Sequence, residues 1–177
     1  MELTKKGQEA NIEVKQLKAT MSWTSAVDFD LAAAYKKTDG ETGVVYFNNQ
    51  GDLNSFPFMK LDEDAGVGDT GGDNTENLTV TKIADEIEKI WFLSWDYGSI
   101  TSAKEARFQN SDLEITIVDD NGSEKSVKLD TGETGNVTNL ATIDNTGISA
   151  KLINSSEVTL WKEFPSSSKE IIEFCAN

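Results

Sequence analysis

The sequence contains no histidine and only one cysteine, Cys175, among its 177 residues. Without histidine the chain cannot build Ser-His-Asp or Cys-His nucleophilic systems, and it lacks the imidazole ligands of most zinc and transition-metal sites. A single cysteine excludes an internal disulfide or a cluster of iron and sulfur, and it is typical of a reducing cytosol. We therefore interpret Cys175 as a small, partly buried apolar side chain rather than as a reactive thiol.

Cationic side chains are also scarce: 16 Lys and Arg stand against 31 Asp and Glu, which gives a net charge of −15. Nucleic acids and anionic membranes bind cationic surfaces, so we expect neither as a partner. No run approaches the ~18 apolar residues of a membrane span, and the N-terminal segment has no apolar signal region. The sequence thus predicts a cytoplasmic protein, and its apolar fraction of 37% is enough to fill the core of a single domain over residues 1–177.

Alternation of apolar and polar residues with a period of two dominates what remains. In residues 27–35 the apolar side chains alternate with Asp28 and Asp30, which predicts a strand with an acidic edge. A turn and the apolar run 43–47 follow, so the two segments indicate a hairpin. A second hairpin is predicted around the Asp-Asp-Asn-Gly turn at 119–122. Further strands are expected at residues 76–82, 90–97, 146–153 and 157–164.

Helical patterns are few and short. Ile83, Ile87 and Ile90 are spaced to share one helical face, which predicts a short helix over 82–90, and residues 101–109 indicate a second. Many short strands joined by Gly, Asn and Asp turns, with only two prolines, predict a mainly β protein. The expected fold is an antiparallel β-sandwich with one or two short helices.

An acidic segment, "LDEDAGVGDTGGDNTEN" at 61–77, holds six carboxylates, four glycines and no Lys or Arg. Near a protein surface, two like charges about 4 Å apart cost on the order of 4 kcal/mol. Water around an open loop, basic groups from elsewhere in the fold, or a bound cation could offset this repulsion. Calcium takes six to eight oxygen ligands from Asp, Glu, Asn and backbone carbonyls, and glycines allow the tight turns that present them. The segment does not fit the EF-hand pattern, and a solvated acidic loop remains the alternative on composition alone.

Four stretches, in this order and spacing, resemble the TerD family of tellurite-resistance and bacterial stress-response proteins: "VDFDLAAAY", "VYFNNQGDLN", "GVGDTGGDNTENLTV" and "IADEIEKIWFLSWDY". The resemblance covers nearly the whole chain and weakens after about residue 100. It implies a calcium-binding β-sandwich with no established enzymatic activity, and protein partners in a stress-response complex. By motif, the resemblance implies ligands at Asp30, Asn48, Asn49, Asp69, Asp73, Asn74 and Glu76.

The sequence departs from this family at one position that bears on the metal. The family often has Asp-Leu-Asp where this chain has Asp30, Leu31 and Ala32. The nearest substitute carboxylate is Asp28, two residues before Asp30 on the same face of the strand. Together with acidic residues of the loop, the candidate calcium ligands are Asp28, Asp30, Asn48, Asn49, Asp62, Asp64, Asp69, Asp73, Asn74 and Glu76.

Two other functions are compatible with the same residues. An acidic interaction module could dock a basic partner with no metal, and such a surface would weaken with any salt. A calcium site would instead prefer calcium over magnesium, because magnesium demands a small octahedral shell. An enzyme that uses paired carboxylates is the third alternative, but no sugar cleft or other substrate signature accompanies them.

Overall fold

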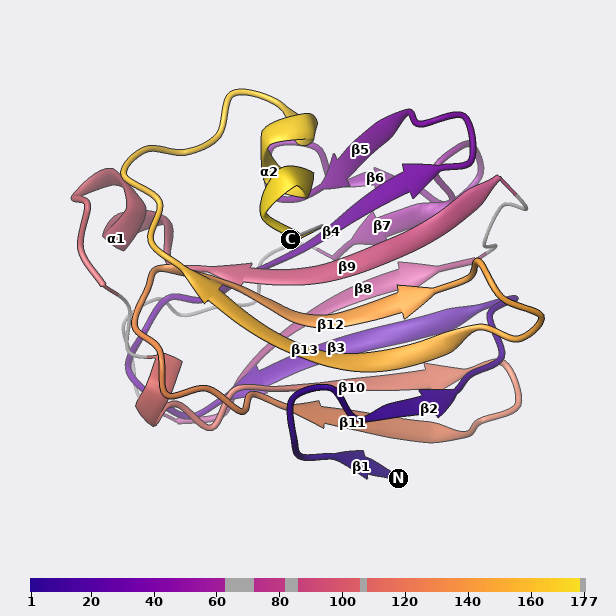
Figure 1. Cartoon of the computed structure of the whole chain (residues 1–177), viewed down its shortest axis with the longest axis horizontal. Helices are drawn as coiled ribbons and strands as arrows, with labels where there is room; N and C mark the ends of the chain where they lie inside the picture. The colour runs from indigo at the N-terminus through magenta and orange to yellow at the C-terminus, as the bar shows by residue number, and fades with distance from the viewer. Residues whose placement is uncertain (63–71, 82–85, 106–107, 176–177) are drawn as a thin grey trace.

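The computed structural model describes residues 1–62, 72–81, 86–105 and 108–175, and it places most of them in two β-sheets (Figure 1). Sheet A has seven strands in the order β1-β11-β10-β3-β8-β7-β6. Sheet B has six strands in the order β2-β13-β12-β9-β4-β5. Neighbouring strands are antiparallel except for β1 and β11, which are parallel. The predicted mainly β sandwich is confirmed.

The strands are short and follow the chain in this sequence of bounds. Those of sheet A are β1 (Glu2–Leu3), β3 (Leu17–Trp23), β6 (Gly51–Asp52), β7 (Met59–Leu61), β8 (Asn74–Val80), β10 (Glu114–Asp119) and β11 (Glu124–Lys128). Those of sheet B are β2 (Glu9–Asn11), β4 (Asp30–Lys37), β5 (Thr42–Val45), β9 (Ile87–Trp95), β12 (Val137–Asp144) and β13 (Lys151–Thr159). The helical elements are α1 (Tyr97–Thr101), the 3-10 turn η1 (Phe108–Asn110) and α2 (Ser168–Cys175).

Both predicted hairpins are present. β4 and β5 pair with Ala33 opposite Val45, and β10 and β11 pair with Ile115 opposite Val127. In the second hairpin the Asp119 carboxylate accepts hydrogen bonds from the backbone amides of Asn121 and Ser123. The turn is thus closed by a short-range side-chain contact that its sequence already indicates.

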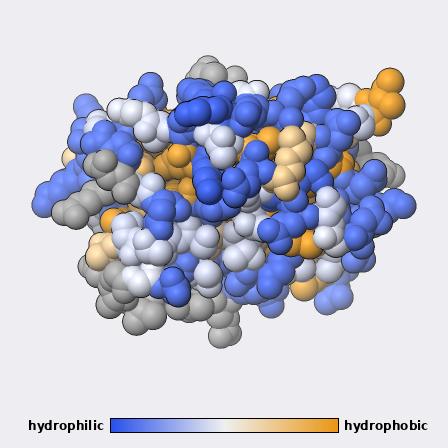
Figure 2. All heavy atoms as spheres, turned by 90° about the horizontal axis from the view of Figure 1, so that it is seen from below, coloured by the Kyte–Doolittle hydropathy of each residue, from blue (hydrophilic) through white to orange (hydrophobic). Residues whose placement is uncertain are grey.

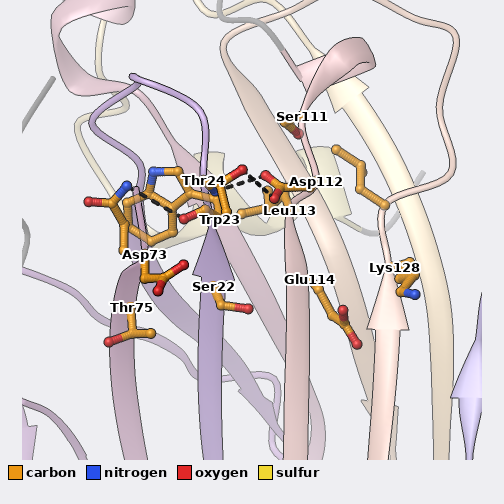
Figure 3. Close-up of a pocket in the computed structure, with 12 residues that line it drawn as sticks. Ser22, Trp23, Thr24, Asp73, Thr75, Ser111, Asp112, Leu113, Glu114 and Lys128 are labelled. Carbon is orange, nitrogen blue, oxygen red and sulfur yellow. Dashed lines mark hydrogen bonds between the residues drawn. The ribbon is translucent and has the colours of Figure 1, made fainter. Parts of the chain in front are cut away.

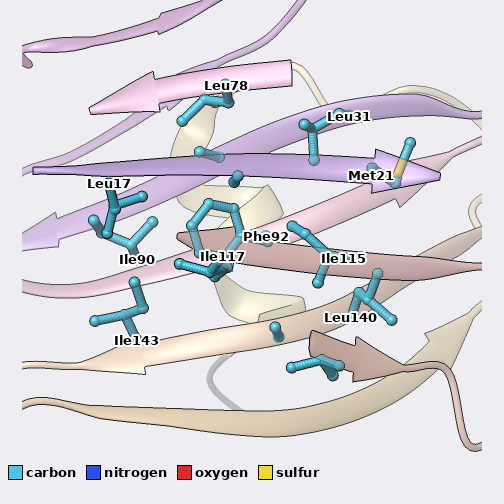
Figure 4. Close-up of a cluster of buried hydrophobic side chains, with 14 of the residues drawn as sticks. Leu17, Met21, Leu31, Leu78, Ile90, Phe92, Ile115, Ile117, Leu140 and Ile143 are labelled. Atoms are coloured by element: carbon cyan, nitrogen blue, oxygen red, sulfur yellow. The ribbon is translucent and has the colours of Figure 1, made fainter. Parts of the chain in front are cut away.

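The main core lies between the two sheets, where the inward faces of their strands meet (Figure 4). β3 shows how the sequence builds it, because its buried positions alternate strictly with less buried ones. The same alternation in residues 27–35 places Phe29, Leu31 and Ala33 in this core and leaves Asp28 exposed, as predicted. Asn154 also links the sheets, since its side-chain amide donates to the carbonyls of Leu3 and Lys128 in sheet A.

A second apolar cluster covers the outer face of sheet B beneath α2. Trp91 and Trp95 of β9 pack there with Ile171 and Ile172 of α2, and Trp161 lies partly buried beside them. Ala32 and Ala34 of β4 belong to this cluster, which explains why β4 is buried on both faces in its middle. No helix in the described part of the chain is long and apolar enough to cross a membrane.

The helix predicted over 82–90 is wrong where the structure can test it. Residues 82–85 lie outside the described residues, and Ile87 to Ile90 belong to β9. Lys36 pairs with Lys89 but Lys37 pairs with Ile87, so Glu88 is the extra residue of a β-bulge. The bulge turns both Ile87 and Ile90 toward the core although they are three residues apart, and this spacing imitates a helical face.

Three further predictions near the C-terminal half need correction. The helix expected at 101–109 lies earlier, at α1, where the carboxylate of Asp96 caps the backbone amide of Ser99. The strands expected at 146–153 and 157–164 are one strand, β13. Its polar middle, Asn154 to Ser156, looked like a turn, but the Ser156 hydroxyl donates to the Asn154 side chain within the sheet. Residues 160–164 lie after its end.

Candidate functional site

The segment that carries Asp28 and Asp30 is fixed by aromatic side chains. The Trp23 indole donates a hydrogen bond of 2.8 Å to the carbonyl of Val27. Phe29 is fully buried between Trp23, with which it forms an edge-to-face contact, and Phe108, on which it stacks. The core therefore holds the backbone on both sides of Asp28, which is exposed, and of Asp30, which begins β4 and is partly buried.

Glu76 is the most deeply buried carboxylate of the candidate set among the described residues. It lies on β8 of sheet A with 7% of its surface exposed, on the inward face that also carries Leu78. Its Oε2 atom accepts a hydrogen bond of 2.5 Å from the backbone amide of Leu31, on β4 of sheet B. β5 pairs with β4 only as far as Val45 opposite Ala33, so Glu76 takes the place of a strand partner beyond that point. A carboxylate from one sheet thereby binds the backbone of the other.

Asn74 and Asp73 lie at the start of β8, next to the turn after Trp23. The Asn74 side chain is 6% exposed, and its amide donates to the carbonyl of Gly72 at 3.2 Å. The backbone amide of Gly72 donates to the carbonyl of Thr24 at 3.0 Å, which fixes the end of the acidic segment on β3. Asp73 is exposed beside them. Two candidate ligands are thus placed within three residues of Glu76.

The acidic segment forms the connection between β7 and β8. Asp62 follows directly after β7, is exposed, and donates its backbone amide to the carbonyl of Asn77 at 2.9 Å. The segment therefore starts and ends on adjacent strands of sheet A. Asp64 and Asp69, which the sequence also proposes as ligands, lie outside the described residues.

The two asparagines proposed from the resemblance lie on the connection between β5 and β6. Asn49 pairs with Tyr46 through two backbone hydrogen bonds, and its side-chain amide donates to the carbonyl of Val44. It lines a cavity of about 280 Å³ beside α2, together with Phe164 and Ser168. Asn48 is exposed in the same turn. The described contacts of Asn49 therefore direct its amide nitrogen toward this cavity.

The missing family carboxylate has a physical explanation in the fold. Ala32 is fully buried in the cluster between sheet B and α2, with Trp91 and Trp95. An aspartate there would place a charge against aromatic rings, at a large desolvation cost. Asp30 and Asp28 precede Ala32 where the chain leaves the sheet and the side chains are more exposed.

The described carboxylates and amides offer the oxygen donors that calcium prefers, and the buried Glu76 carboxylate would gain from a nearby cation. In residues 1–62, 72–81, 86–105 and 108–175, no group of three or more acidic or thiol side chains is placed to hold a metal ion by itself. The described residues thus fit part of an oxygen-ligated cation site.

A separate hollow of about 560 Å³ lies over the outer face of sheet A, and the sequence reasoning did not find it (Figure 3). One row of its side chains crosses four neighbouring strands, in the register Thr75, Ser22, Glu114 and Lys128. Asp73, Thr24 and Asp112 surround its upper end in Figure 3. We call this space the sheet A hollow. The signal was available, because the inward alternation of Leu113 and Ile115 leaves Asp112 and Glu114 on the outward face.

Asp112 is held in place by a residue 88 positions away. Its two carboxylate oxygens accept from the backbone amide and the hydroxyl of Thr24, at 2.8 and 2.6 Å. Partial burial raises the pKa of Asp112, but these hydrogen bonds outweigh it and hold the pKa below its ordinary value. The carboxylate is therefore ionised at neutral pH and has a fixed orientation.

This lowered pKa predicts a pH-dependent effect of Asp112→Asn. Because the pKa is lower in the folded state, the stabilisation is fully present above the unfolded value of about 3.9 and is lost as pH falls through the folded value. The melting temperature of Asp112→Asn should therefore fall below that of the parent at neutral pH, and the two should converge below about pH 4. Calorimetric melts over this range measure the difference. A difference that stays constant with pH would contradict the assignment.

Comparisons with known proteins show the fold only. No protein-family model matches the chain, and no curated protein matches it. Among solved structures, the chain is similar to a protein of unknown function, SAV2460, with a TM-score of 0.54 and 13% sequence identity. The match covers 82% of this chain and 92% of that one. The class that the comparison and the two sheets define is a mainly β sandwich.

Proposed function

We propose that this chain is a cytoplasmic, calcium-binding, non-enzymatic protein of a single domain, with a stress-response role like that of the TerD family it resembles. The observation that carries the proposal is the buried Glu76 carboxylate, which lies between Asn74 and the backbone of Leu31, next to the start of β4 at Asp30. A buried carboxylate is costly unless hydrogen bonds and positive charge compensate it. The Leu31 amide supplies one such hydrogen bond, and a bound cation would supply the charge.

The chemistry of the donor set favours calcium over other ions. Carboxylate and amide oxygens are hard ligands, and a chain without histidine and with one cysteine offers little to softer metals. Calcium accepts six to eight ligands in irregular geometry, which suits side chains contributed by two sheets and a connecting loop. In this proposal Asp30, Asp73, Asn74 and Glu76 belong to the site, together with ligands from residues 63–71.

Calcium would supply charge compensation and a crosslink rather than a reaction. It would join the β7–β8 connection to the start of β4, and so join sheet A to sheet B at the point where Glu76 already meets Leu31. A ligand that binds only the folded state stabilises it by about 2.7 kcal/mol at a hundredfold excess over Kd. We therefore expect the melting temperature of chelator-treated protein to rise on addition of calcium.

Calorimetric titration of chelator-treated protein with calcium tests the proposal. Asp30→Ala, Asp73→Ala and Glu76→Gln should each weaken calcium binding by at least about tenfold, because each removes a charged ligand. Glu76→Gln retains the shape of the side chain and an oxygen that can accept from Leu31, so it separates the charge from the hydrogen bond. Asp28→Ala reports whether Asp28 has taken the role of the family aspartate at position 32.

The control is Glu124→Ala, an exposed carboxylate at the start of β11, which should bind calcium like the parent. Magnesium and sodium at matched ionic strength distinguish a coordination site from general screening. If Asp30→Ala and Asp73→Ala both bind calcium with the parent affinity, the acidic segment is a solvated loop and the proposal fails.

A further inference from the structure

The sheet A hollow is negatively charged on most of its rim. Asp73, Asp112 and Glu114 line it, against one ammonium group, that of Lys128. Lys128 also lies 3.6 Å from the carboxylate of Glu2, in an exposed ion pair that leaves the hollow with unmatched negative charge. The chain as a whole has a net charge of −15, which adds a long-range attraction for cations.

The walls of the hollow combine small polar and apolar groups. Ser22, Thr24 and Thr75 carry short hydroxyl side chains, and these leave the space above the strands open. Trp23 and Leu113, both nearly fully buried, contribute apolar surface to the same space. Binding sites for organic ligands commonly pair apolar walls with a few oriented polar groups. This hollow therefore suits a guest with an aliphatic stem and a charged, hydrogen-bonding end.

The carboxylates are already oriented before any guest arrives. Asp112 is fixed by its two hydrogen bonds from Thr24, and Figure 3 shows both as dashed lines beside the row formed by Ser22 and Glu114. Each carboxylate oxygen of Asp112 retains a further lone pair that can accept from a guest. Glu114 is held on the central strand β10, between β3 and β11. Fixed acceptors lose little conformational entropy on binding.

We propose that the sheet A hollow docks an arginine-bearing segment of a partner protein. Arginine fits better than lysine, because its planar guanidinium presents several donors in a fixed fork that matches carboxylates, while its aliphatic stem packs on apolar surface. A volume of about 560 Å³ accommodates an arginine side chain together with part of its backbone. Neighbouring rims of Asp112 and Glu114 define where the guanidinium binds.

This inference does not rest on calcium. Asp73 and Asn74 line the hollow and are also candidate calcium ligands, but Asp112, Glu114 and Lys128 are not. Glu76 points to the interior of the sandwich, whereas Glu114 and Ser22 lie on the outward face of sheet A. Glu114 is therefore the residue that tests docking without disturbing the proposed metal site.

The experiment titrates the isotope-labelled full chain with a capped peptide, acetyl-Ala-Arg-Ala-Arg-Ala-amide, and follows backbone amide NMR signals in chelator. The matched probe carries citrulline in place of each arginine, which removes the charge and retains the shape. We expect the arginine peptide to shift signals of β3, β8, β10 and β11 around the hollow, and the citrulline peptide to bind at least about tenfold more weakly. Glu114→Gln should weaken the arginine peptide by a similar factor.

The matched control is Glu124→Gln, which removes the same charge from the far end of the same hairpin and should bind the peptide like the parent. Asp30→Ala should also bind the peptide like the parent, even where it has lost calcium, so the two proposals can fail independently. Equal binding of the citrulline peptide, or equal weakening by Glu124→Gln and Glu114→Gln, would overturn docking at the hollow. Spermidine that binds the same signals as tightly as the peptide would overturn a protein partner in favour of a free polyamine.

Discussion

Replacement of Phe29 by alanine is expected to lower the free energy of unfolding by about 3–5 kcal/mol, the usual cost of deleting a buried aromatic ring. Phe29 is fully buried, lies 4.9 Å from the ring centre of Phe108 in a stacked arrangement, and contacts the edge of Trp23 at 5.7 Å. Few neighbours can collapse into the space, because both aromatic partners are held by their own strands and turns. Urea unfolding followed by tryptophan fluorescence measures the loss.

The same substitution should also weaken calcium binding, since Phe29 fixes the backbone between Asp28 and Asp30. Phe29→Leu is the matched control: it retains most of the buried volume and should cost less than about 1.5 kcal/mol. Calcium affinity should follow the same order, with Phe29→Leu close to the parent and Phe29→Ala weaker. Parent-like stability of Phe29→Ala would show that the aromatic contacts do not anchor this segment.

Alkylation of Cys175 in the folded protein is expected to be about a thousandfold slower at pH 8 than in denaturant, because only the thiolate reacts. Burial raises the pKa of Cys175 from an ordinary value near 9 to about 12. The thiol also donates to the carbonyl of Ile171 at 3.4 Å within α2, where the side chain packs beside the second apolar cluster. This environment agrees with the sequence interpretation of Cys175 as an apolar side chain.

Iodoacetamide labelling followed by intact mass spectrometry gives both rates. Ile172→Ala is an informative companion, because Ile172 anchors α2 to sheet B and its truncation should open the helix more often. Labelling of Cys175 should then accelerate without any change in the intrinsic reactivity of the thiol. A parent rate within a few fold of the denatured rate would contradict the buried thiol.

Local patterns predicted local structure well in this chain. The Asp-Asp-Asn-Gly turn and the alternation of Val27, Phe29 and Leu31 depend on neighbouring residues, and both are confirmed. The helix pattern at Ile87 and Ile90 failed because a single bulge at Glu88 shifts the period, and no local residue announces it. The helix α2 was missed although Ser167 and Glu170 carry the Ser-x-x-Glu spacing of a helix start.

The candidate site shows the limit of sequence reasoning in another way. The sequence named Glu76 and Asp30, but it could not show that Glu76 binds a backbone amide 45 residues away on the opposite sheet. It also missed Asp112, whose partner Thr24 is 88 residues distant. Such contacts depend on the order of strands in the two sheets, and that order is not written in any short motif. The role of the proposed ligands remains a prediction.

The bond between Glu76 and Leu31 makes the two positions unequal in what mutation can do to them. The donor at position 31 is a main-chain amide, which every amino acid except proline supplies. Evolution can therefore exchange the side chain at 31 for any apolar residue that fills the core and still preserve the bond. At position 76 only a side chain of similar length with an acceptor oxygen can replace it. A deep mutational scan should thus find position 31 tolerant of hydrophobic exchange but not of proline, and position 76 narrow, so that one inter-sheet contact is encoded almost entirely by one of its two codons.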